Sequence, residues 1–355
     1  MNDFLSTYTG KKVFITGHTG FKGSWLGFLL KELGATVRGF ALAPETEFSL
    51  FELLHLQNNI DHCIGDIRDA TSLKKAIDDF QPEFVFHLAA QAIVTKSYDD
   101  PVKTFDTNIM GSVNLLDAVK QCESVKSLVY ITSDKCYENV EWLWGYREND
   151  RLGGHDPYSA SKAAAEIVFS AYARSFFSLR PDLGAATTRA GNVIGGGDWS
   201  SNRLIPDCLR AIKNNLPVKL RNPSATRPWQ HVLEPISGYL QLGHRLFFNP
   251  DQYSGSWNFG PSATEIRTVE EVVTSLINHL GRGSIELEEN NQKIHEATLL
   301  QLNCEKAKQL LDWAPRWDVE RALKATGDWY KVFLKGGSIK DISRKQLNDY
   351  FKELV

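Results

Sequence analysis

The first half of the chain alternates between two patterns of hydrophobic and polar positions. Short apolar runs, rich in β-branched and aromatic residues, predict buried strands at residues 12–16, 36–41, 60–65, 84–89, 128–132 and 185–190. Apolar residues at helical spacing predict helices between them, at residues 23–33, 72–80, 102–121 and 157–174. Strands that alternate with helices of this length predict an α/β fold whose parallel sheet has right-handed crossovers.

A glycine-rich turn follows the first predicted strand. Gly17, Gly20 and Gly23 separate this strand from the next predicted helix. A strand, a glycine turn and a helix in this order direct backbone N–H groups and a helix N-terminus at a phosphate. Glycine is needed because a Cβ atom would block the tight turn and the close approach of the backbone to a pyrophosphate. The pattern predicts a Rossmann-type, doubly wound sheet that binds a dinucleotide at the carboxyl ends of its strands.

The pattern is less regular after residue 192. Helices are predicted at residues 204–214, 235–247, 269–280, 304–311, 322–334 and 343–354, with a short strand at 218–220. We expect a dinucleotide-binding domain at residues 1–192, to which residues 229–260 return. Residues 193–228 and 261–355 are then expected to form most of a smaller, mixed lobe that binds the substrate.

The amino-acid composition limits the kinds of molecule that the chain is expected to bind. The chain has 355 residues, 42% of them hydrophobic and 23% charged, and its net charge of −3 gives no reason to expect nucleic acid or an anionic membrane. The N-terminus lacks a signal-peptide pattern, and the longest apolar stretch is too short to span a bilayer. Five scattered cysteines and nine histidines without metal-ligand spacing indicate reduced thiols and no metal site. These features predict a cytoplasmic globular protein.

Tyr158 and Lys162 form the strongest candidate for chemistry. They are four residues apart, so on a helix they share one face. A phenol with a reference pKa of roughly 10 is a poor base near neutral pH. A nearby ammonium and the positive nicotinamide ring of an oxidised cofactor would both favour the phenolate, which could then remove an alcohol proton as hydride leaves the same carbon. The alternative is a surface pair that occurs by chance, which the glycine turn upstream makes less favourable.

Ser133, Asp134 and Lys135 follow the strand predicted at residues 128–132. A hydroxyl at this sheet edge can hydrogen-bond the reacting oxygen. Two adjacent ionisable groups are more than a simple dehydrogenase needs, and they suggest a further proton transfer, such as elimination of water next to a carbonyl. The alternative is a polar turn between a strand and a loop.

Further candidates for binding a dinucleotide follow other strands. Asp66 could accept a hydrogen bond from an adenine amino group, or it could instead cap the following helix. His87 precedes small residues that would let a cofactor pass close by, although a buried structural role suits it equally well. The second strand ends without an acidic residue, and Arg38 lies too early in it to meet a 2′-phosphate, which favours NAD over NADP.

Arg203 and Arg227 are candidate anchors for a diphosphate. Guanidinium groups offer paired donors that match phosphate oxygens. A surface salt bridge is the alternative for either arginine.

These residues together resemble the extended short-chain dehydrogenase/reductases that modify nucleotide sugars, over nearly the whole chain from Lys12 to about Trp329. The matching motifs are Thr16-Gly-x-x-Gly-Phe-x-Gly23, His87-Leu-Ala-Ala-Gln91, Asn108, Tyr158-x-x-x-Lys162, Asn192 and Trp257-Asn-Phe-Gly260. Three further segments resemble the branch of 4,6-dehydratases that acts on CDP-glucose: Thr132-Ser-Asp-Lys-Cys-Tyr137, Arg189-Ala-Gly-Asn-Val-Ile-Gly-Gly-Gly-Asp-Trp199 and Arg227-Pro-Trp-Gln-His-Val232. Sister dehydratases for dTDP-glucose or GDP-mannose usually carry Asp-Glu in place of Asp134-Lys135.

The resemblance implies an NAD-dependent lyase of deoxysugar biosynthesis for a cell-surface polysaccharide such as a lipopolysaccharide O-antigen. Tyr158 would take the proton of the sugar 4-hydroxyl, with Lys162 lowering the phenol pKa and binding the nicotinamide ribose, and with Ser133 orienting the hydroxyl. Asp134 would protonate the departing 6-hydroxyl. Lys135 would either assist removal of the C5 proton as a neutral amine or stabilise the enolate as a cation.

The same resemblance implies binding residues and partners. The expected cofactor-binding residues, besides Tyr158 and Lys162, are Gly17, Thr19, Gly20, Phe21, Lys22, Gly23, Asp66, Ile67, Leu88, Ala89, Ala90, Gln91, Asn108 and Thr132. The expected substrate-binding residues are Asn192, Arg203, Leu204, Lys219, Arg221, Arg227 and His231. We expect CDP-glucose as substrate, and a homodimer or homotetramer paired through the helices predicted at 102–121 and 157–174. The alternatives are a 4-epimerase, a dehydratase for another nucleotide, or a non-catalytic NAD-binding sensor.

Overall fold

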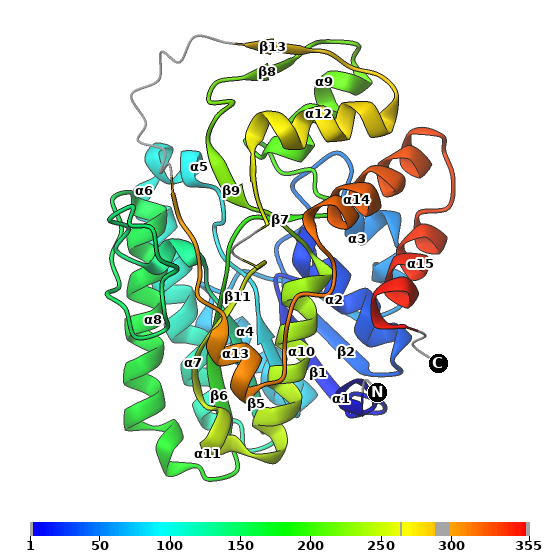
Figure 1. Cartoon of the computed structure of the whole chain (residues 1–355). Helices are drawn as coiled ribbons and strands as arrows, with labels where there is room; N and C mark the ends of the chain where they lie inside the picture. The colour runs from blue at the N-terminus through cyan, green and yellow to red at the C-terminus, as the bar shows by residue number, and fades with distance from the viewer. Residues whose placement is uncertain (1–2, 263–264, 288–298, 353–355) are drawn as a thin grey trace.

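A seven-stranded parallel sheet forms the centre of the computed structural model, which describes residues 3–262, 265–287 and 299–352 (Figure 1). Its strands are β1 (Lys12–Thr16), β2 (Thr36–Ala41), β3 (Asp61–Ile64), β4 (Phe84–His87), β5 (Ser127–Ile131), β6 (Gly184–Ala190) and β11 (Gly255–Phe259). Their order is β11-β6-β5-β4-β1-β2-β3, and every neighbouring pair is parallel. The order reverses between β1 and β4, which is where doubly wound sheets bind their ligands. The predicted fold class is confirmed.

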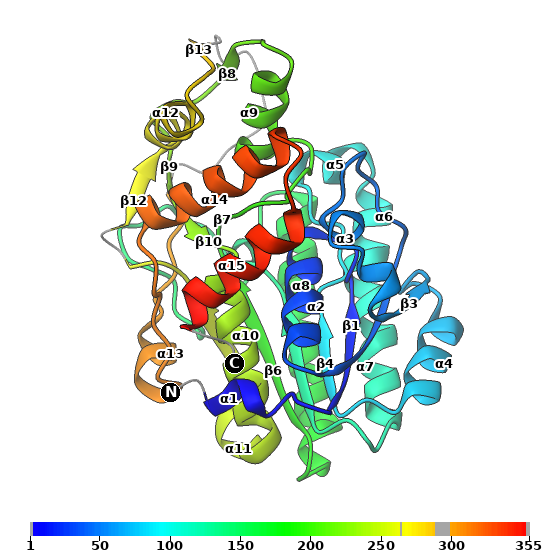
Figure 2. The same ribbon diagram turned by 90° about the vertical axis from the view of Figure 1, so that its right-hand side faces the viewer.

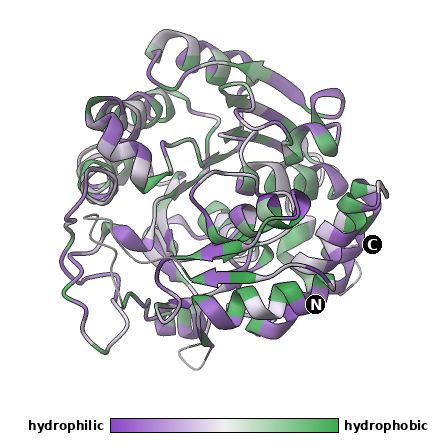
Figure 3. Ribbon diagram, turned by 90° about the horizontal axis from the view of Figure 1, so that it is seen from above, coloured by the Kyte–Doolittle hydropathy of each residue, from purple (hydrophilic) through white to green (hydrophobic). Residues whose placement is uncertain are grey.

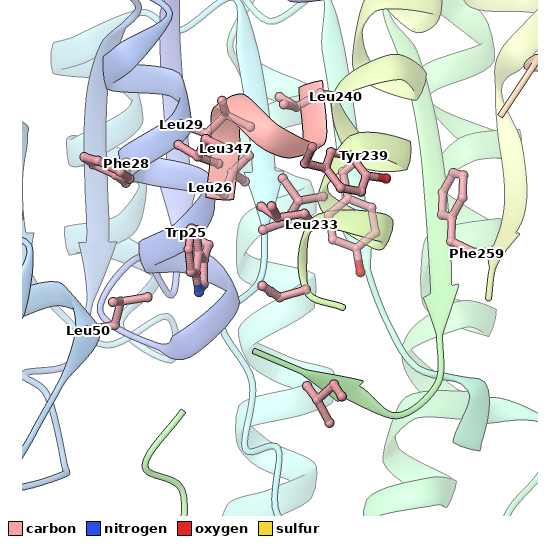
Figure 4. Close-up of a cluster of buried hydrophobic side chains, with 14 of the residues drawn as sticks. Trp25, Leu26, Phe28, Leu29, Leu50, Leu233, Tyr239, Leu240, Phe259 and Leu347 are labelled. Atoms are coloured by element: carbon pink, nitrogen blue, oxygen red, sulfur yellow. The ribbon is translucent and has the colours of Figure 1, made fainter. Parts of the chain in front are cut away.

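Alternate residues of the central strands pack on opposite faces of the sheet. On β1, Val13 and Ile15 join the larger hydrophobic core, whereas Phe14 joins the other. The larger core lies against α2 (Phe21–Glu32) and α10 (Leu233–Phe248). Figure 4 shows Leu29 of α2 and Leu240 of α10 in this cluster. The second core lies against α4 (Ala70–Phe80), α7 (Gly111–Gln121) and α8 (Pro157–Ser175).

The single helix predicted at residues 102–121 is interrupted. It consists of α6 (Pro101–Phe105), a π-helical turn (Asp106–Met110) and α7. Asn108 in the π-helical turn is buried and bonded to other segments, so tertiary contacts rather than local preference set this irregular turn. Such turns are frequent at functional sites.

A smaller group of elements lies beyond one end of the sheet (Figure 1, Figure 2). It contains two short strand pairs, β8 (Val218–Leu220) with β13 (Ile285–Leu287) and β9 (Thr226–Pro228) with β12 (Ile266–Thr268). Helices α9 (Leu204–Lys213) and α12 (Val269–Leu280) accompany them. The remaining elements are α1 (Asp3–Ser6), α3 (Leu50–Leu53), α5 (Val94–Asp99), α11 (Pro250–Tyr253), α13 (Glu305–Leu310), α14 (Val319–Leu334), β7 (Val193–Ile194) and β10 (Gln230–His231).

The last helix, α15 (Ile339–Phe351), packs against α14 and also contacts α2. Arg344 Nε donates to Glu32 Oε2 of α2 at 2.7 Å, and Leu347 belongs to the same hydrophobic core as Leu29 (Figure 4). The expectation that residues 261–355 belong mainly to the second lobe stays a prediction. The helix predicted at 343–354 starts earlier than expected, and the end of that prediction lies outside the described residues.

Seen from above, many helices show hydrophilic and hydrophobic stretches side by side (Figure 3). This pattern is typical of helices that cover a core with one face. Among the residues that the structure describes, no helix is both long enough and apolar enough to cross a membrane.

Candidate active site

The glycine turn after β1 packs tightly against the segment after β4. Gly17 has a φ of +76°, which favours glycine, and a Cβ atom there would lie 2.7 Å from the backbone nitrogen of Ala89. A Cβ atom on Gly23 would lie 2.1 Å from the carbonyl oxygen of Gly17. Gly20 is exposed and precedes the first turn of α2. The turn therefore leaves backbone at a helix N-terminus open to an anion, which fits a dinucleotide phosphate.

Lys22 connects this turn electrostatically with the candidate catalytic groups. Burial lowers its pKa to about 8, Arg203 and Lys162 lower it further, and the carboxylates of Asp134 and Asp198 raise it. Its ammonium therefore lies within the field of groups from three other segments of the chain. In the same turn, Thr19 Oγ1 donates to the carbonyl oxygen of Leu42 at 2.9 Å, so this side chain supports the turn from the β2 side.

Ser133 and Asp134 lie at the carboxyl end of β5. Ser133 Oγ donates to Asp134 Oδ1 at 3.0 Å and accepts from the backbone nitrogen of Lys135 at 3.3 Å, which caps a 3₁₀ turn over Asp134–Cys136. Burial raises the pKa of Asp134, although Lys135 and the hydrogen bond from Ser133 lower it. A buried carboxyl group with a raised pKa is suited to give a proton. Lys135 is only half-buried, next to this carboxyl group.

Tyr158 and Lys162 lie in the first turns of α8, both buried. Burial raises the pKa of Tyr158 to about 12, and a hydrogen bond with Ser133 lowers it in part. Burial lowers the pKa of Lys162 to about 8. The structure thus brings the serine, the phenol and the amine together. The chain alone does not produce the lowered phenol pKa that we expected, because the burial of Tyr158 outweighs the charges around it.

Asn108 holds the loop after β4. Its Oδ1 accepts from the backbone nitrogen of Gln91 at 2.8 Å, and its Nδ2 donates to the carbonyl oxygen of Gln91 and to Ser161 Oγ. These bonds use both polar atoms of the amide. Asn108 therefore positions Gln91 and the catalytic helix, and its expected contact with the cofactor stays a prediction.

Two other polar side chains near the strand ends also have hydrogen-bond partners within the protein. Thr132 Oγ1 donates to Glu166 Oε1 at 2.5 Å, so only its backbone would remain for a cofactor. His87 is buried, its Nδ1 is bonded to Thr16 Oγ1 at 2.7 Å, and burial lowers its pKa to about 3. The structural interpretation of His87 is the one that these contacts favour.

Asp66 and Ile67 follow β3. The carboxylate of Asp66 accepts from Arg68, from its backbone nitrogen at 2.9 Å, from Nε at 3.0 and 3.1 Å and from Nη2 at 2.6 Å. Asp69, and not Asp66, caps α4 by accepting from Ser72, so the interpretation of Asp66 as a helix cap is wrong. Ile67 is buried and packs against Gly111.

The expected substrate residues are distributed over several elements. Arg203 precedes α9, which begins at Leu204, and its Nη1 donates to Asp198 Oδ2 at 3.3 Å. It also acts on the pKa of Tyr158 and of Lys22, so it faces the catalytic groups. Asn192 precedes β7, Arg227 lies in β9, and Lys219 and Arg221 are exposed at β8.

His231 lies in the hydrophobic core and not at a surface that a substrate could reach. It is fully buried, and its ring is 6.3 Å from that of Trp25 and 4.9 Å from that of Trp317. Burial lowers its pKa to about 3, so it is a neutral ring. The assignment of His231 to the substrate site is corrected accordingly.

Two charged residues at the site were missed from the sequence. Asp198 is buried and bonded to Arg203, and the signal was its place in the glycine-rich segment 195–199. Arg267 lies directly opposite Arg227 in the antiparallel β9–β12 pair, which no sequence spacing could indicate. Two like charges directly opposite each other are unfavourable, and Glu320 Oε1, at 3.8 Å from Arg267 Nε, partly offsets them.

The comparisons with known proteins agree with this geometry. A family model described as GDP-mannose 4,6-dehydratase matches residues 14–326 of the chain. The chain belongs to this family. Among its relatives, the CDP-glucose 4,6-dehydratase of Salmonella typhimurium is 48% identical over 347 residues, which cover 97% of each chain.

Solved structures of the same fold include epimerases and a dTDP-glucose 4,6-dehydratase. An epimerase from Methanothermobacter thermautotrophicus has a TM-score of 0.79 and 25% identity, covering 97% of both chains. The UDP-glucose 4-epimerase of Thermus thermophilus, solved in complex with NAD, has a TM-score of 0.76 and 25% identity over 89% of this chain and 98% of its own. The similarity to enzymes that modify nucleotide sugars is therefore confirmed over nearly the full chain.

Proposed function

We propose that this protein is a CDP-glucose 4,6-dehydratase that uses NAD. The observation that carries this proposal is the presence of Ser133, Asp134 and Lys135 beside the Tyr158–Lys162 face, in a chain that is 48% identical to an enzyme with this activity. The reaction converts CDP-glucose into CDP-4-dehydro-6-deoxyglucose and water. The product is a precursor of the type that deoxysugar pathways require.

NAD fits the residues at the switch point of the sheet. The glycine turn would hold its diphosphate on the backbone and on the N-terminus of α2, with Phe21 and Lys22 beside it. Asp66 and Ile67 would lie at its adenine end, and Leu88, Ala89, Ala90 and the backbone of Thr132 along its length. Bound NAD would supply the hydride acceptor for oxidation at C4 of the sugar and the hydride for reduction at C6.

Tyr158 and its neighbours act on the first proton transfer. Tyr158 takes the proton of the 4-hydroxyl, and Ser133 orients this hydroxyl through its hydrogen bond to the phenol. A charged Lys162 favours the phenolate. Because the folded chain by itself raises the pKa of Tyr158 to about 12, the base forms only when positive charge is added beside the phenol.

The middle step eliminates water across C5 and C6. Oxidation at C4 makes the C5 proton acidic, and Asp134 gives a proton to the departing 6-hydroxyl, a role that suits a buried carboxyl group whose pKa is raised by burial. Lys135 takes the C5 proton or stabilises the enolate. An epimerase needs no such acid–base pair, so Asp134 and Lys135 favour the dehydratase.

The second lobe, expected to be formed mainly by residues 193–228 and 261–355, would bind the nucleotide. Arg203 and Arg227 would hold the diphosphate, supported by Asn192 and Leu204, with Lys219 and Arg221 near the nucleoside. Closing this lobe over the sheet edge keeps water from the intermediate, which must stay bound until C6 is reduced.

A homodimer, or a homotetramer built from it, would cover apolar side chains on the outer helices. Val102 of α6 and Ile167 of α8 are 78% and 60% exposed, and Phe105 and Met110 lie on the same stretch of chain. Such residues favour association through α6, α7 and α8. The composition agrees with a cytoplasmic enzyme.

The proposal is tested by incubating the protein with CDP-glucose, UDP-glucose, dTDP-glucose and GDP-mannose in separate reactions. We expect the 4-keto-6-deoxy product, detected by its absorbance in alkali, from CDP-glucose. Product from another nucleotide sugar would overturn the nucleotide assignment. Formation of a 4-epimer without loss of water would overturn the reaction.

A further inference from the structure

Glu166 extends the helix face that carries the candidate catalytic groups. Tyr158, Lys162 and Glu166 are spaced four residues apart, so they lie along one side of α8. The carboxylate of Glu166 is buried and bonded to two strands. Thr132 Oγ1 donates to its Oε1 at 2.5 Å, and Thr187 Oγ1 donates to its Oε2 at 2.9 Å. Glu166 therefore ties the catalytic helix to the ends of β5 and β6.

Arg189 of β6 completes this arrangement. Its Nε donates to Glu166 Oε1 at 3.0 Å and its Nη2 to Oε2 at 2.7 Å, which is the paired geometry of a strong charge-assisted contact. The two side chains are only 3% and 2% exposed. Nη1 of Arg189 also donates to the hydroxyl of Tyr137 at 2.7 Å, and the guanidinium lies over the Tyr137 ring.

These contacts fix both ends of the catalytic segment. Thr132 directly precedes it and Tyr137 directly follows the 3₁₀ turn, and both are bonded to the same ion pair. A buried ion pair contributes little net stability compared with apolar residues of the same shape, because both charges lose their hydration. Its better-supported use is to enforce one arrangement of the chain.

We propose that Glu166 and Arg189 are a positioning pair that holds residues 133–135 in register with Tyr158 and Lys162. This inference rests on the proposed function, because that function defines which groups react. Neither member of the pair is a catalytic residue, since each acts through the segment that it holds.

The pair also affects the charge of the catalytic amine. Burial lowers the pKa of Lys162 to about 8, and Cys136 and Glu166 raise it. The other ionisable groups in its field are Lys22 from α2 and His87 from β4. Removing the charge of Glu166 therefore lowers the pKa of Lys162, and the alkaline loss of activity moves to lower pH.

The first test is Glu166→Gln in the NAD-loaded enzyme. We expect kcat with CDP-glucose to fall by about 10- to 100-fold, because a small misplacement of reacting groups has effects of this size, while KM changes little. The alkaline limb of the kcat profile should move to lower pH. Arg189→Gln should move the same limb to higher pH, because the charge of Glu166 is then uncompensated. If the two substitutions only destabilised the fold, the alkaline limbs of the two kcat profiles would not move in opposite directions.

Glu234→Gln is the matched control. Glu234 is also a buried helical glutamate, but it accepts from the backbone nitrogens of Arg316 and Trp317 and from the hydroxyl of Tyr350. It should lower stability and leave kcat and the pH profile of the folded enzyme unchanged. Wild-type kcat and pH profile in Glu166→Gln, or equal changes in Glu234→Gln, would overturn the proposal.

Two further measurements keep the test decisive. Thr132→Val, which keeps the ion pair and should fold, removes one link and is expected to lower kcat by about tenfold; an unchanged kcat would overturn the proposal. If the wild type converts no nucleotide sugar, the proposed function fails, and amide hydrogen exchange then tests the pair by itself. Faster exchange at residues 133–137 in Glu166→Gln than in Glu234→Gln supports the positioning role, and equal exchange overturns it.

Discussion

Two regions of this molecule each bury a carboxyl group to nearly the same extent, but the two groups have different roles. Asp134 at the sheet edge is 6% exposed, and Glu234 in α10 has no exposed surface. Burial raises the pKa of both groups, that of Glu234 to about 7. Glu234 accepts from two backbone nitrogens and from Tyr350, which ties α10 to the C-terminal helix. Asp134 accepts from Ser133 and lies in the fields of Lys135 and Lys22.

The difference shows that a raised pKa does not identify a reacting group. The partners of Glu234 are mostly fixed backbone donors, which suit a group that holds elements together. Asp134 is surrounded by ionisable side chains from the ends of different elements, at the point where doubly wound sheets bind ligands. Convergence of titratable groups at a ligand edge, rather than burial, distinguishes the functional region.

Tyr158→Phe is the substitution with the largest expected effect on the functional region. Turnover of CDP-glucose should fall by at least about 1,000-fold because the base is lost, within the range for general-base catalysis. NAD binding, measured by fluorescence titration, should be nearly unchanged, because the ring remains. Retained turnover would show that Tyr158 is not the base.

Asp134→Asn should have a smaller effect on the same region. We expect elimination to slow by about 100-fold, since the amide cannot give a proton. A 4-keto hexose or reduced cofactor should accumulate. The absorbance of the reduced nicotinamide measures the accumulation of reduced cofactor. The free energy of unfolding should fall little, because burial already disfavours the charged carboxylate. Wild-type rates without any accumulation would make this carboxyl group structural.

Glu234→Gln should give the opposite pattern in the other region. The amide cannot accept all three hydrogen bonds, so the free energy of unfolding should fall by about 1–3 kcal/mol. Urea denaturation measures this change, and kcat per folded molecule provides the control. Lost activity at unchanged stability would contradict the division between the two regions.

The last expected effect is the pH dependence of the free energy of unfolding, which is spread over more than two pH units. Glu234 has a folded pKa of about 7, raised from 4.5 by burial, so the folded state holds its proton more tightly than the unfolded chain. Its contribution is complete below about pH 4.5 and is lost as pH rises to about 7, by at most roughly 3 kcal/mol. Glu234→Gln should flatten this part of the profile. An equal slope in both proteins would assign it to other groups.

Local patterns predicted the sheet better than the connections around it. All six strands that the apolar runs predicted are present, with ends shifted by at most two residues. The seventh, β11, was missed because Ser256 and Asn258 interrupt its apolar pattern. Those polar residues are satisfied by long-range hydrogen bonds, which a local pattern does not contain. The π-helical turn at Asp106–Met110 was missed for the same reason.

For the candidate site, too, short sequence patterns predicted some residues and missed others. The spacing of Tyr158 and Lys162 and the place of Ser133 after a strand predicted a shared site, and the structure brings these three residues together. His231 was misjudged because a motif does not show which of its side chains turns into the core. Asp198 was missed because its segment was interpreted only as a glycine-rich turn, although its carboxylate accepts from Arg203 five residues further along the chain.

The sequence by itself determined the order of strands and helices, the glycine turn and the family to which the chain belongs, because these depend on residue type and short spacing. Only the tertiary structure decided which charges meet. Lys22 reaches Asp134, and Arg189 reaches Glu166, across large separations in sequence. Burial then shifts the proton affinities of these groups, since the loss of hydration depends on everything that packs around a side chain.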